Sequence, residues 1–289
     1  MPGMIRIGSI EINLLLESLV YMDGGGAFGL VPRALWSRLL PPDADHLVPM
    51  TQHCLLVRTG GRTLLVDTGL GPKISEKQRQ VTKMTHPRGP LNEALARLGV
   101  APSAIDLVIN THLHSDHCGG NTVINEEGSL VAAFENAEYV VQRREYEDAM
   151  RPNERTRATY LAENFQPLVE RGQMRLLDGD TDLAPGVRGV VTPGHTPGHM
   201  SVLFESEGEY GLFVCDLASY AIHFERLSWM TAYDVEPLIT LETKRQWQGW
   251  ALQTNALLIF PHDSQRPAGR LVAVEGGRPL VIPVDVPYA

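Results

Sequence analysis

The amino-acid sequence predicts an α+β fold in which two packed β-sheets are covered by helices. The predicted strands fall into two groups along the chain with amphipathic helices among them, a pattern typical of two sheets with helical outer layers. The segments rich in histidine and aspartate follow predicted strands, where loops on a rigid scaffold can hold binding residues. Because these segments extend over most of the 289 residues, we expect one domain spanning residues 1–289.

The first group of strands begins near the N-terminus, where Ile5–Leu16 alternates apolar and polar residues. Gly60-Gly61 is a two-residue turn signal, so the strands on either side of it are expected to form a hairpin. Helices are predicted at Pro90–Leu98, which has an apolar face, and at the charged segment Arg143–Met150. The other strands predicted in this group are Cys54–Thr59, Arg62–Asp67, Ile105–Thr111 and Ala137–Gln142.

The remaining predicted strands lie in the C-terminal part of the chain. They are Met174–Leu177, Arg188–Val191, Met200–Glu205, Tyr210–Cys215, Ala256–Phe260 and Leu271–Val274. The best long helix, Glu236–Gln253, precedes the last two of these strands. We expect Asp234 to cap this helix, because aspartate accepts backbone N–H groups at helix N-termini, and Pro237 suits the first turn.

Residues 21–50 interrupt this pattern with a glycine-rich loop that carries Phe28 and Trp36. A long loop with exposed aromatic side chains can roof a pocket or contact a second subunit. We therefore predict that this excursion lies near the active site or at a homodimer interface. An ordinary surface arm is the alternative.

The composition is that of a soluble protein, with 43% hydrophobic residues and a formal net charge of −9. This negative charge makes a nucleic-acid backbone a poor partner. The spacing of Cys54, Cys118 and Cys215 does not suggest a disulfide framework. No secretory leader is recognisable, and no apolar stretch reaches the roughly 20 residues that a membrane helix needs. We therefore expect a cytoplasmic protein that binds neither a membrane nor a nucleic acid.

The segment His112-Leu-His-Ser-Asp-His117 predicts a metal site. Histidine and aspartate supply the nitrogen and oxygen ligands that suit zinc and similar divalent ions. Three imidazoles this close together would repel one another once protonated, so the arrangement is unfavourable unless a metal offsets the cost. The apolar run Ile105–Asn110 predicts a strand that leads into the segment, and Gly119-Gly120 allow a tight backbone after it.

This segment resembles the His-x-His-x-Asp-His motif of the metallo-β-lactamase superfamily. Four further segments resemble the remaining motifs of that superfamily, in the same order. They contain Asp67 in Leu64-Leu-Val-Asp-Thr-Gly69, His195 in Thr192-Pro-Gly-His-Thr-Pro-Gly-His199, Asp216 after the strand Gly211–Cys215, and His262 after Ala256–Pro261. The resemblance implies the metallo-β-lactamase fold, a four-layer αββα sandwich, which agrees with the two sheets expected from the strand pattern.

The resemblance also implies two divalent metal ions. His112, His114 and His195 would hold the first ion, Asp116, His117 and His262 the second, and Asp216 would bridge the two. Asp67 would orient a ligand histidine through a hydrogen bond. Zn²⁺ is expected, and Co²⁺, Mn²⁺ and Fe²⁺ suit the same ligands. Two ions about 3.5–4 Å apart can share a hydroxide that attacks an ester-type electrophile, so a dinuclear metal-dependent hydrolase is implied.

A lactone, such as an N-acyl homoserine lactone, is the first hypothesis for the substrate, because an apolar loop at 21–50 would suit an acyl chain. An organophosphate or aryl-ester hydrolase of the methyl-parathion-hydrolase type is the alternative, which a pocket with several aromatic side chains would favour. Hydrolysis of thioesters, as by glyoxalase II, comes third. The last hypothesis is of a different class: a metal-binding protein without catalysis, which would have no small-molecule ester or lactone as substrate.

Asp116, Asp216 and Tyr220 are the predicted catalytic residues. The lactonase branch of the superfamily places a tyrosine three residues after the bridging aspartate, whereas Asp216-Leu-Ala-Ser-Tyr220 places it one position later. Tyr220 is therefore either a hydrogen-bond donor in the pocket or a packing residue. His199 is expected to support the site without binding metal. Cys215 is expected to point away from Asp216, as a buried apolar thiol, because neighbours on a strand face opposite ways.

Overall fold

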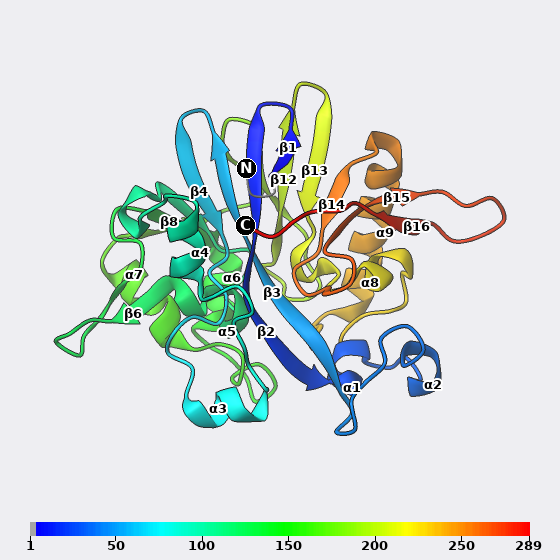
Figure 1. Cartoon of the computed structure of the whole chain (residues 1–289), viewed down its shortest axis with the longest axis horizontal. Coiled ribbons are helices and arrows are strands. Elements are labelled where there is room, and N and C mark those ends of the chain that lie inside the picture. The colour runs from blue at the N-terminus through cyan, green and yellow to red at the C-terminus, as the bar shows by residue number, and fades with distance from the viewer. Residues whose placement is uncertain (1–3) are drawn as a thin grey trace.

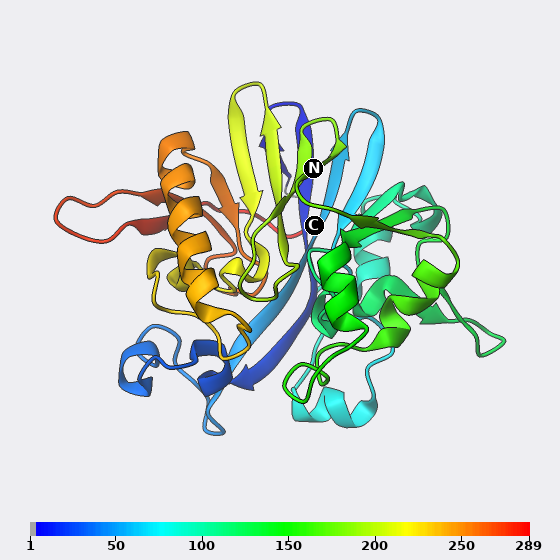
Figure 2. The same ribbon diagram turned by 180° about the vertical axis from the view of Figure 1, so that it is seen from behind.

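The computed structural model describes residues 4–289, and within them two seven-stranded sheets pack face to face (Figure 1, Figure 2). The first sheet has the order β1-β2-β3-β4-β5-β8-β9. Its strands are β1 (Ile5–Ile7), β2 (Ile10–Asp23), β3 (Leu47–Thr59), β4 (Arg62–Val66), β5 (Leu107–Ile109), β8 (Glu138–Gln142) and β9 (Met174–Leu177). Neighbours from β4 to β9 run parallel, so the loops after β4 and β5 leave the sheet at the same edge.

The second sheet contains the strands from β10 to β16 in chain order. They are β10 (Thr181–Ala184), β11 (Val187–Val191), β12 (Met200–Ser206), β13 (Glu209–Phe213), β14 (Leu257–Ile259), β15 (Ala268–Val272) and β16 (Leu280–Pro283). Strands β13 and β14 are parallel neighbours, with Phe213 opposite Ile259. The loops that follow them therefore also emerge together. A small separate hairpin pairs β6 (Thr122–Ile124) with β7 (Leu130–Ala132).

Apolar side chains from the facing sides of the two sheets form the central core. Ile12, Leu55 and Val66 of the first sheet belong to the same buried cluster as Val202 and Phe213 of the second. Helices cover the outer faces, as the two views show (Figure 1, Figure 2). Those over the first sheet are α4 (Leu91–Arg97), α6 (Arg143–Ala149) and α7 (Gln166–Glu170), and those over the second are α8 (Ala221–Glu225) and α9 (Pro237–Thr254). The predicted αββα sandwich is confirmed.

Most predicted elements are present, and the helices α4, α6 and α9 have ends within one residue of the prediction. Strands β6, β7, β10 and β16 were not predicted. Shorter helices also appear, namely α3 (Glu76–Val81), α5 (Ser115–Cys118) and the 3-10 turns Pro102–Ala104, Gly119–Asn121, Ala162–Asn164 and Cys215–Leu217. No helix within residues 4–289 is both long and apolar enough to cross a membrane.

Residues 21–50 differ from the prediction, because both ends of this segment belong to the long β2–β3 pair rather than to a loop. The pairing continues to Asp23, which lies opposite Leu47. Only residues 24–46 leave the sheet, and they contain α1 (Gly24–Phe28) and α2 (Arg33–Trp36). The single strand predicted over 5–16 is instead two antiparallel strands, β1 and β2, with Ile7 opposite Ile10. Strand β2 also continues past residue 16, where it is buried on both faces over much of its length.

The expectation of exposed aromatic side chains in this segment is wrong. Phe28 and Trp36 are buried and stack on each other, with ring centroids 5.1 Å apart. Trp229 from the loop after α8 packs edge-on against Phe28. Large aromatic rings bury much apolar area when they pack together, so the two rings hold residues 24–46 against the body of the protein.

Candidate metal centre

The loops that carry the predicted ligands meet at one end of the sandwich. Asp67 follows β4, and the segment 112–117 follows β5, its parallel neighbour. Asp216 and His262 follow β13 and β14, which are parallel neighbours in the other sheet. His195 lies in the connection between β11 and β12. Strand direction therefore brings together residues that are far apart in the sequence.

The first cluster (His112, His114 and His195) is buried. Nε2 of His195 lies 3.1 Å from Nδ1 of His114 and 3.3 Å from Oδ2 of Asp216. Nε2 of His112 lies 3.8 Å from the same Asp216 oxygen. One ligand atom from each of these four side chains therefore faces a common point, where a single ion could be held.

The second cluster (Asp116, His117 and His262) lies on the other side of Asp216. Nε2 of His117 is 3.3 Å from Nε2 of His262, and both nitrogens are within 3.8 Å of Oδ2 of Asp116. Asp216 also faces this cluster, because its Oδ2 is 3.4 Å from Nε2 of His117 and its Oδ1 is 3.0 Å from Nε2 of His262. The Asp216 carboxylate thus lies between two groups of possible ligands.

The chemistry of these side chains fits bound cations. Nε2 of His112 is buried and has no hydrogen-bond partner among residues 4–289, which is costly for a polar atom unless an ion takes up its lone pair. Burial and the neighbouring histidines hold the pKa of His112 and His114 well below the usual value, so both imidazoles are neutral and able to coordinate. Ligands of a tetrahedral zinc ion lie about 3.3 Å apart, close to the separations seen here.

Asp67 is placed where the prediction expects it, behind a ligand histidine. Its Oδ2 accepts a hydrogen bond from Nδ1 of His117 at 2.9 Å. The same carboxylate accepts from the backbone N–H and the hydroxyl of Thr111. His199 also lies beside the site, since its Nε2 accepts the backbone N–H of Asp216 at 3.1 Å. Hydrogen bonds of this kind fix the orientation of ligand side chains.

Asp234 differs from the prediction. Helix α9 begins at Pro237, and its N-cap residue, Glu236, makes no side-chain cap. The Asp234 carboxylate turns instead to the first cluster, where it accepts from Nδ1 of His195 at 3.0 Å. The only signal in the sequence was indirect, because a histidine that binds a metal commonly donates its second nitrogen to a carboxylate.

Glu145 is a second residue that sequence reasoning missed. It is buried in α6, where its Oε1 accepts the backbone N–H of Leu113 and the hydroxyl of Tyr160, each at 3.0 Å. Its Oε2 accepts the hydroxyl of Thr196 at 2.5 Å. Leu113 lies between two ligands of the first cluster and Thr196 follows the third, so one carboxylate ties both loops together.

Cys215 is buried as predicted, but its thiol does not point away from the polar site. Its Sγ lies 3.0 Å from Oγ1 of Thr111 and 3.7 Å from Nδ1 of His117. Strand β13 ends at Phe213, and Cys215 has a positive φ of 50° in a 3-10 turn. The alternation of side chains along a strand therefore does not apply to this residue.

Tyr220 is a packing residue in this structure. Its hydroxyl donates a hydrogen bond to the carbonyl of Pro49 at 3.2 Å, and its ring stacks on Phe28. Tyr220 still lines the cavity beside the clusters. The aromatic packing that buries Phe28 thus also takes up the hydroxyl of the predicted catalytic tyrosine.

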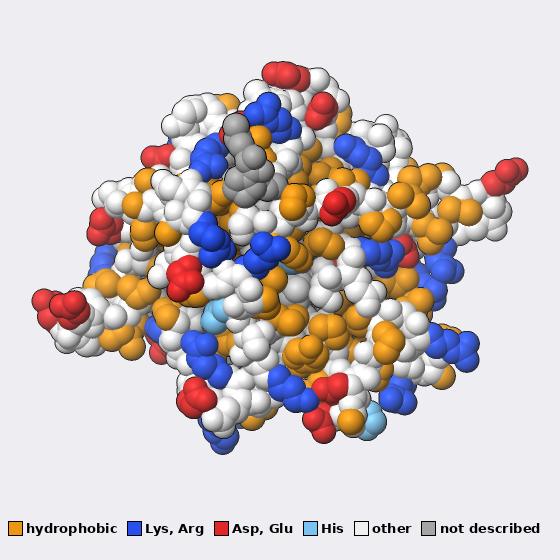
Figure 3. All heavy atoms as spheres, in the orientation of Figure 1, with side chains coloured by type: hydrophobic (Ala, Val, Ile, Leu, Met, Phe, Trp, Pro, Cys, Tyr) orange, Lys and Arg blue, Asp and Glu red, His pale blue; other side chains and the backbone are white. Residues whose placement is uncertain are grey.

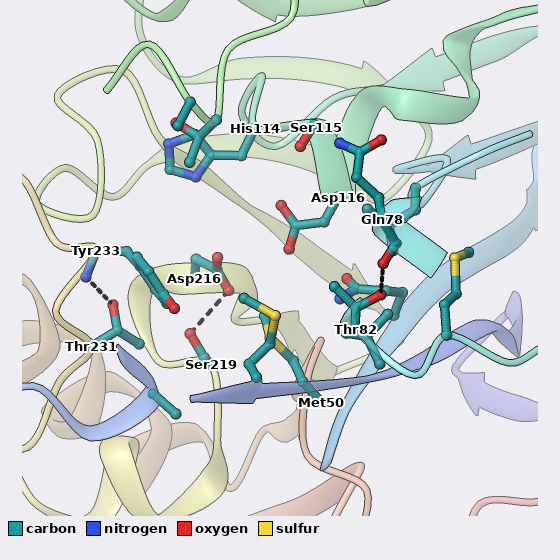
Figure 4. Close-up of a pocket in the computed structure, with 18 of the residues that line it drawn as sticks. Met50, Gln78, Thr82, His114, Ser115, Asp116, Asp216, Ser219, Thr231 and Tyr233 are labelled. Atoms are coloured by element: carbon teal, nitrogen blue, oxygen red, sulfur yellow. Dashed lines mark hydrogen bonds between the residues drawn. The ribbon is translucent and has the colours of Figure 1, made fainter. Parts of the chain in front are cut away.

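A cavity of about 250 Å³ opens beside both clusters. His114, Asp116 and Asp216 line its base, and Figure 4 shows their side chains directed toward the same space. Its apolar wall comes from β2, β3 and the segment 70–84, and consists of Val20, Met22, Met50, Leu70, Ile74 and Met84. Among the described residues that line it, the tyrosines are Tyr220 and Tyr233.

Comparison with known proteins agrees with this site. The model of the metallo-beta-lactamase superfamily matches residues 47–263. An N-acyl homoserine lactonase from Bacillus sp is 30% identical over 235 residues, which cover 78% of this chain and 86% of that protein. A probable metal-dependent hydrolase from Staphylococcus aureus has a TM-score of 0.86 at 28% identity, over 98% of this chain and 100% of its own.

A more distant structure shares the fold. AidC, described as a dizinc quorum-quenching lactonase in complex with a product, has a TM-score of 0.80 at 21% identity, over 98% of this chain and 97% of its own. With the superfamily model covering most of the chain and the ligand clusters in place, the resemblance in the motifs is confirmed. The chain belongs to the metallo-beta-lactamase superfamily and is a metal-dependent hydrolase.

Proposed function

We propose that this hydrolase opens lactones, with N-acyl homoserine lactones as the first candidate substrates. The observation that carries the proposal is the wall of the cavity, where Met22, Met50 and Met84 lie beside Ile74 and other aliphatic side chains. Methionine is flexible and fits irregular apolar shapes, so such a wall suits an acyl chain of variable length. The name of the Bacillus relative supports the same substrate class.

The residues proposed to hold the two ions are those of the first and second clusters, with Asp216 shared between them. Zinc is the proposed metal, because four or more imidazole nitrogens with carboxylates suit it well, and Co²⁺, Mn²⁺ or Fe²⁺ suit the same donor set. When bound, two such ions acidify water and polarise an acyl oxygen.

The side chains of the chain itself have three tasks in this proposal. The apolar wall binds the acyl chain and excludes water from the ester. Asp216 orients the histidines on both sides, because it contacts His117, His195 and His262. Asp116 has 24% of its side chain exposed, at the base of the cavity, and is in position to accept the proton of the attacking water and pass it to the leaving ring oxygen. The ring C–O bond breaks, and the products are a carboxylate and an alcohol.

An aryl-ester or organophosphate hydrolase is the alternative class. Several aromatic side chains around the cavity would favour it, but Phe28 and Trp36 pack against each other instead. The charge distribution supports a small-molecule substrate over a nucleic acid, because acidic and basic side chains are interspersed on the face in Figure 3 and the net charge is −9. A single domain, a cytoplasmic location and a homodimer through residues 21–50 stay predictions.

The test compares kcat/KM of the metal-loaded protein for N-hexanoyl and N-decanoyl homoserine lactone with kcat/KM for an aryl phosphotriester. We expect the lactone values to be higher by orders of magnitude, and His112→Ala to lose the activity. A preference for the phosphotriester would contradict the proposal. Equal, very slow turnover of both classes would also contradict it.

A further inference from the structure

We propose that Tyr233, and not Tyr220, supplies the phenol that donates a hydrogen bond to the acyl oxygen of the substrate. The inference rests on the proposed function, since it needs a substrate with an acyl carbonyl. It assigns a catalytic residue that lies outside every motif recognised in the sequence.

Two residues that closely follow Asp216 in the sequence, Ser219 and Tyr220, carry hydroxyl groups that already donate hydrogen bonds within the protein. The Tyr220 hydroxyl donates to the carbonyl of Pro49, and the ring is held between Phe28 and His223. Ser219 occupies the position three residues after Asp216, and its hydroxyl donates to Oδ1 of Asp216 at 3.1 Å. Neither hydroxyl can reach a substrate without breaking its present hydrogen bond.

Tyr233 is free to donate. It lies in the loop between α8 and α9 and lines the cavity together with Asp116 and Asp216. The close-up shows its hydroxyl pointing into the space next to Asp216 and Ser219 (Figure 4). Its hydroxyl has no hydrogen-bond partner among residues 4–289, although the side chain is half-buried. A phenol directed into a mostly apolar cavity needs an acceptor, and an acyl oxygen would provide one.

The loop of Tyr233 is anchored to the metal centre. The backbone N–H of Tyr233 donates to Oγ1 of Thr231, and that hydroxyl donates to Oδ1 of Asp234 at 2.7 Å. The same Asp234 oxygen accepts from Nδ1 of His195. A short chain of hydrogen bonds therefore links the backbone of Tyr233 to a histidine of the first cluster, which anchors the residue beside the candidate metal site.

Gly26 of α1 sets the position of the phenol from the opposite side. The backbone N–H of Ala232 donates to the carbonyl of Gly26 at 2.9 Å, which brings the loop close to α1. A Cβ atom at Gly26 would lie 2.2 Å from the Tyr233 hydroxyl oxygen and 2.9 Å from Cζ. A larger residue at position 26 would therefore displace the phenol from its present place.

The chemistry favours a donor at this place. When water adds to the acyl carbon, its carbonyl oxygen gains negative charge, and a hydrogen bond to that oxygen becomes stronger as the charge develops. Such a donor stabilises the transition state more than the bound substrate. Its loss is therefore expected to lower kcat with little change in KM.

The experiment compares Tyr233→Phe with Tyr220→Phe, two substitutions that each remove one hydroxyl. With N-hexanoyl homoserine lactone, we expect Tyr233→Phe to lower kcat by about 100-fold, the usual loss for one oxyanion donor, while two metal ions stay bound. Tyr220→Phe should lose far less kcat and show a lower Tm, because its hydroxyl supports packing. A larger kcat loss in Tyr220→Phe overturns the assignment.

A second pair of variants tests the position of the phenol without removing it. Gly26→Ala should lower kcat by displacing Tyr233, although alanine is a better helix former than glycine. Gly249→Ala in α9 is the control, because a Cβ there has open space. Equal kcat values in the two variants would contradict the proposed position.

Binding gives a readout that does not depend on turnover. Calorimetry with the ring-opened product N-hexanoyl homoserine should show weaker binding to Tyr233→Phe than to the wild type. If the wild type opens no lactone but cleaves p-nitrophenyl butyrate, the lactone proposal fails and the same pairs are compared on that acyl ester, with the same expectation. Cleavage of phosphotriesters alone, or no hydrolysis of an acyl ester, overturns both proposals.

Discussion

The two clusters differ in their ligand types, because the first consists of three buried histidines and the second includes a partly exposed carboxylate. His112, His114 and His195 are at most 5% exposed, whereas the Asp116 side chain of the second cluster is 24% exposed toward the cavity. Carboxylates also support them differently. Asp234 and Glu145 act on the first cluster from two elements of the chain, while Asp67 and the carbonyl of Thr51 hold the histidines of the second.

This difference indicates that the clusters on the two sides of Asp216 have different roles. We expect the first cluster, with two supporting carboxylates, to hold its ion more firmly, because few of its side chains can move without breaking hydrogen bonds. We expect the second cluster, with one partly exposed carboxylate, to exchange its ion more readily. The predictions that follow test whether the two clusters behave as separate units.

Removal of Asp216 should have the largest effect, because this carboxylate contacts both clusters. Loss of a residue that hydrogen-bonds to a ligand side chain usually lowers activity by about 10–100-fold. We expect Asp216→Ala to reduce kcat/KM by more than this. Metal analysis should find neither ion tightly bound. His112→Ala and His262→Ala, which each alter one cluster, should keep about one ion. Two tightly held ions in Asp216→Ala would contradict a shared carboxylate.

Asp234→Asn and Asp67→Asn form a matched pair that should separate the clusters. Each substitution weakens a hydrogen bond to a ligand histidine, so we expect a loss of metal affinity of about 10–100-fold in each. The ion that is lost should differ: the first in Asp234→Asn and the second in Asp67→Asn. Spectra of the Co²⁺-loaded variants during titration with a chelator measure this. Identical spectra would show that the clusters are not independent.

Glu145→Gln should reduce stability more than metal binding. Glu145 accepts three hydrogen bonds in a buried position, and an amide can accept on only one of its two atoms. We expect the free energy of unfolding to fall by about 1–3 kcal/mol, measured with denaturant on metal-free protein. Glu147→Gln, at an exposed position of the same helix, is the control. Equal stability of the two variants would argue against the role given to Glu145.

Cys215→Ala should have the smallest effect. Loss of the buried sulfur should cost about 0.5–1.5 kcal/mol, as for one methyl-sized group. Because the thiol contacts Thr111 and lies near His117, affinity for the second ion should fall slightly, which a Co²⁺ titration can detect. Cys54→Ala provides the comparison, since Cys54 is buried in the core under the outer helices of the first sheet. A loss of the first ion in Cys215→Ala would contradict the placement of the thiol.

The candidate metal ligands could be identified from the sequence because their signal is local and resembles the motifs of the superfamily. His112, His114 and His117 are within six positions of one another, and the other ligands each follow a short apolar strand. Strand direction then determines which loop ends meet. The helices α4 and α9 could be predicted for a similar reason, since periodicity and composition lie within the segment itself.

The supporting residues could not be predicted in the same way. Asp234 precedes a helix, and its position alone favours a cap, yet its carboxylate binds a histidine from a loop 39 positions earlier in the chain. The glycine-rich sequence around Phe28 and Trp36 favours an exposed loop, yet the two rings stack on each other. In each case the deciding contact joins segments that are distant in sequence, and no local pattern records it.

The sequence by itself determined the two groups of strands covered by helices and the candidate ligand types, because these depend on periodicity and on side-chain chemistry at strand ends. The resemblance of its motifs added the superfamily and the αββα architecture. Only the tertiary structure decided which tyrosine hydroxyl at the cavity has no hydrogen-bond partner among the described residues and which carboxylates support the candidate ligands. The physical reason is that a hydroxyl or carboxylate has several possible partners of similar strength. Packing selects among them, and here it gives Tyr220 the Pro49 carbonyl while leaving the Tyr233 hydroxyl free.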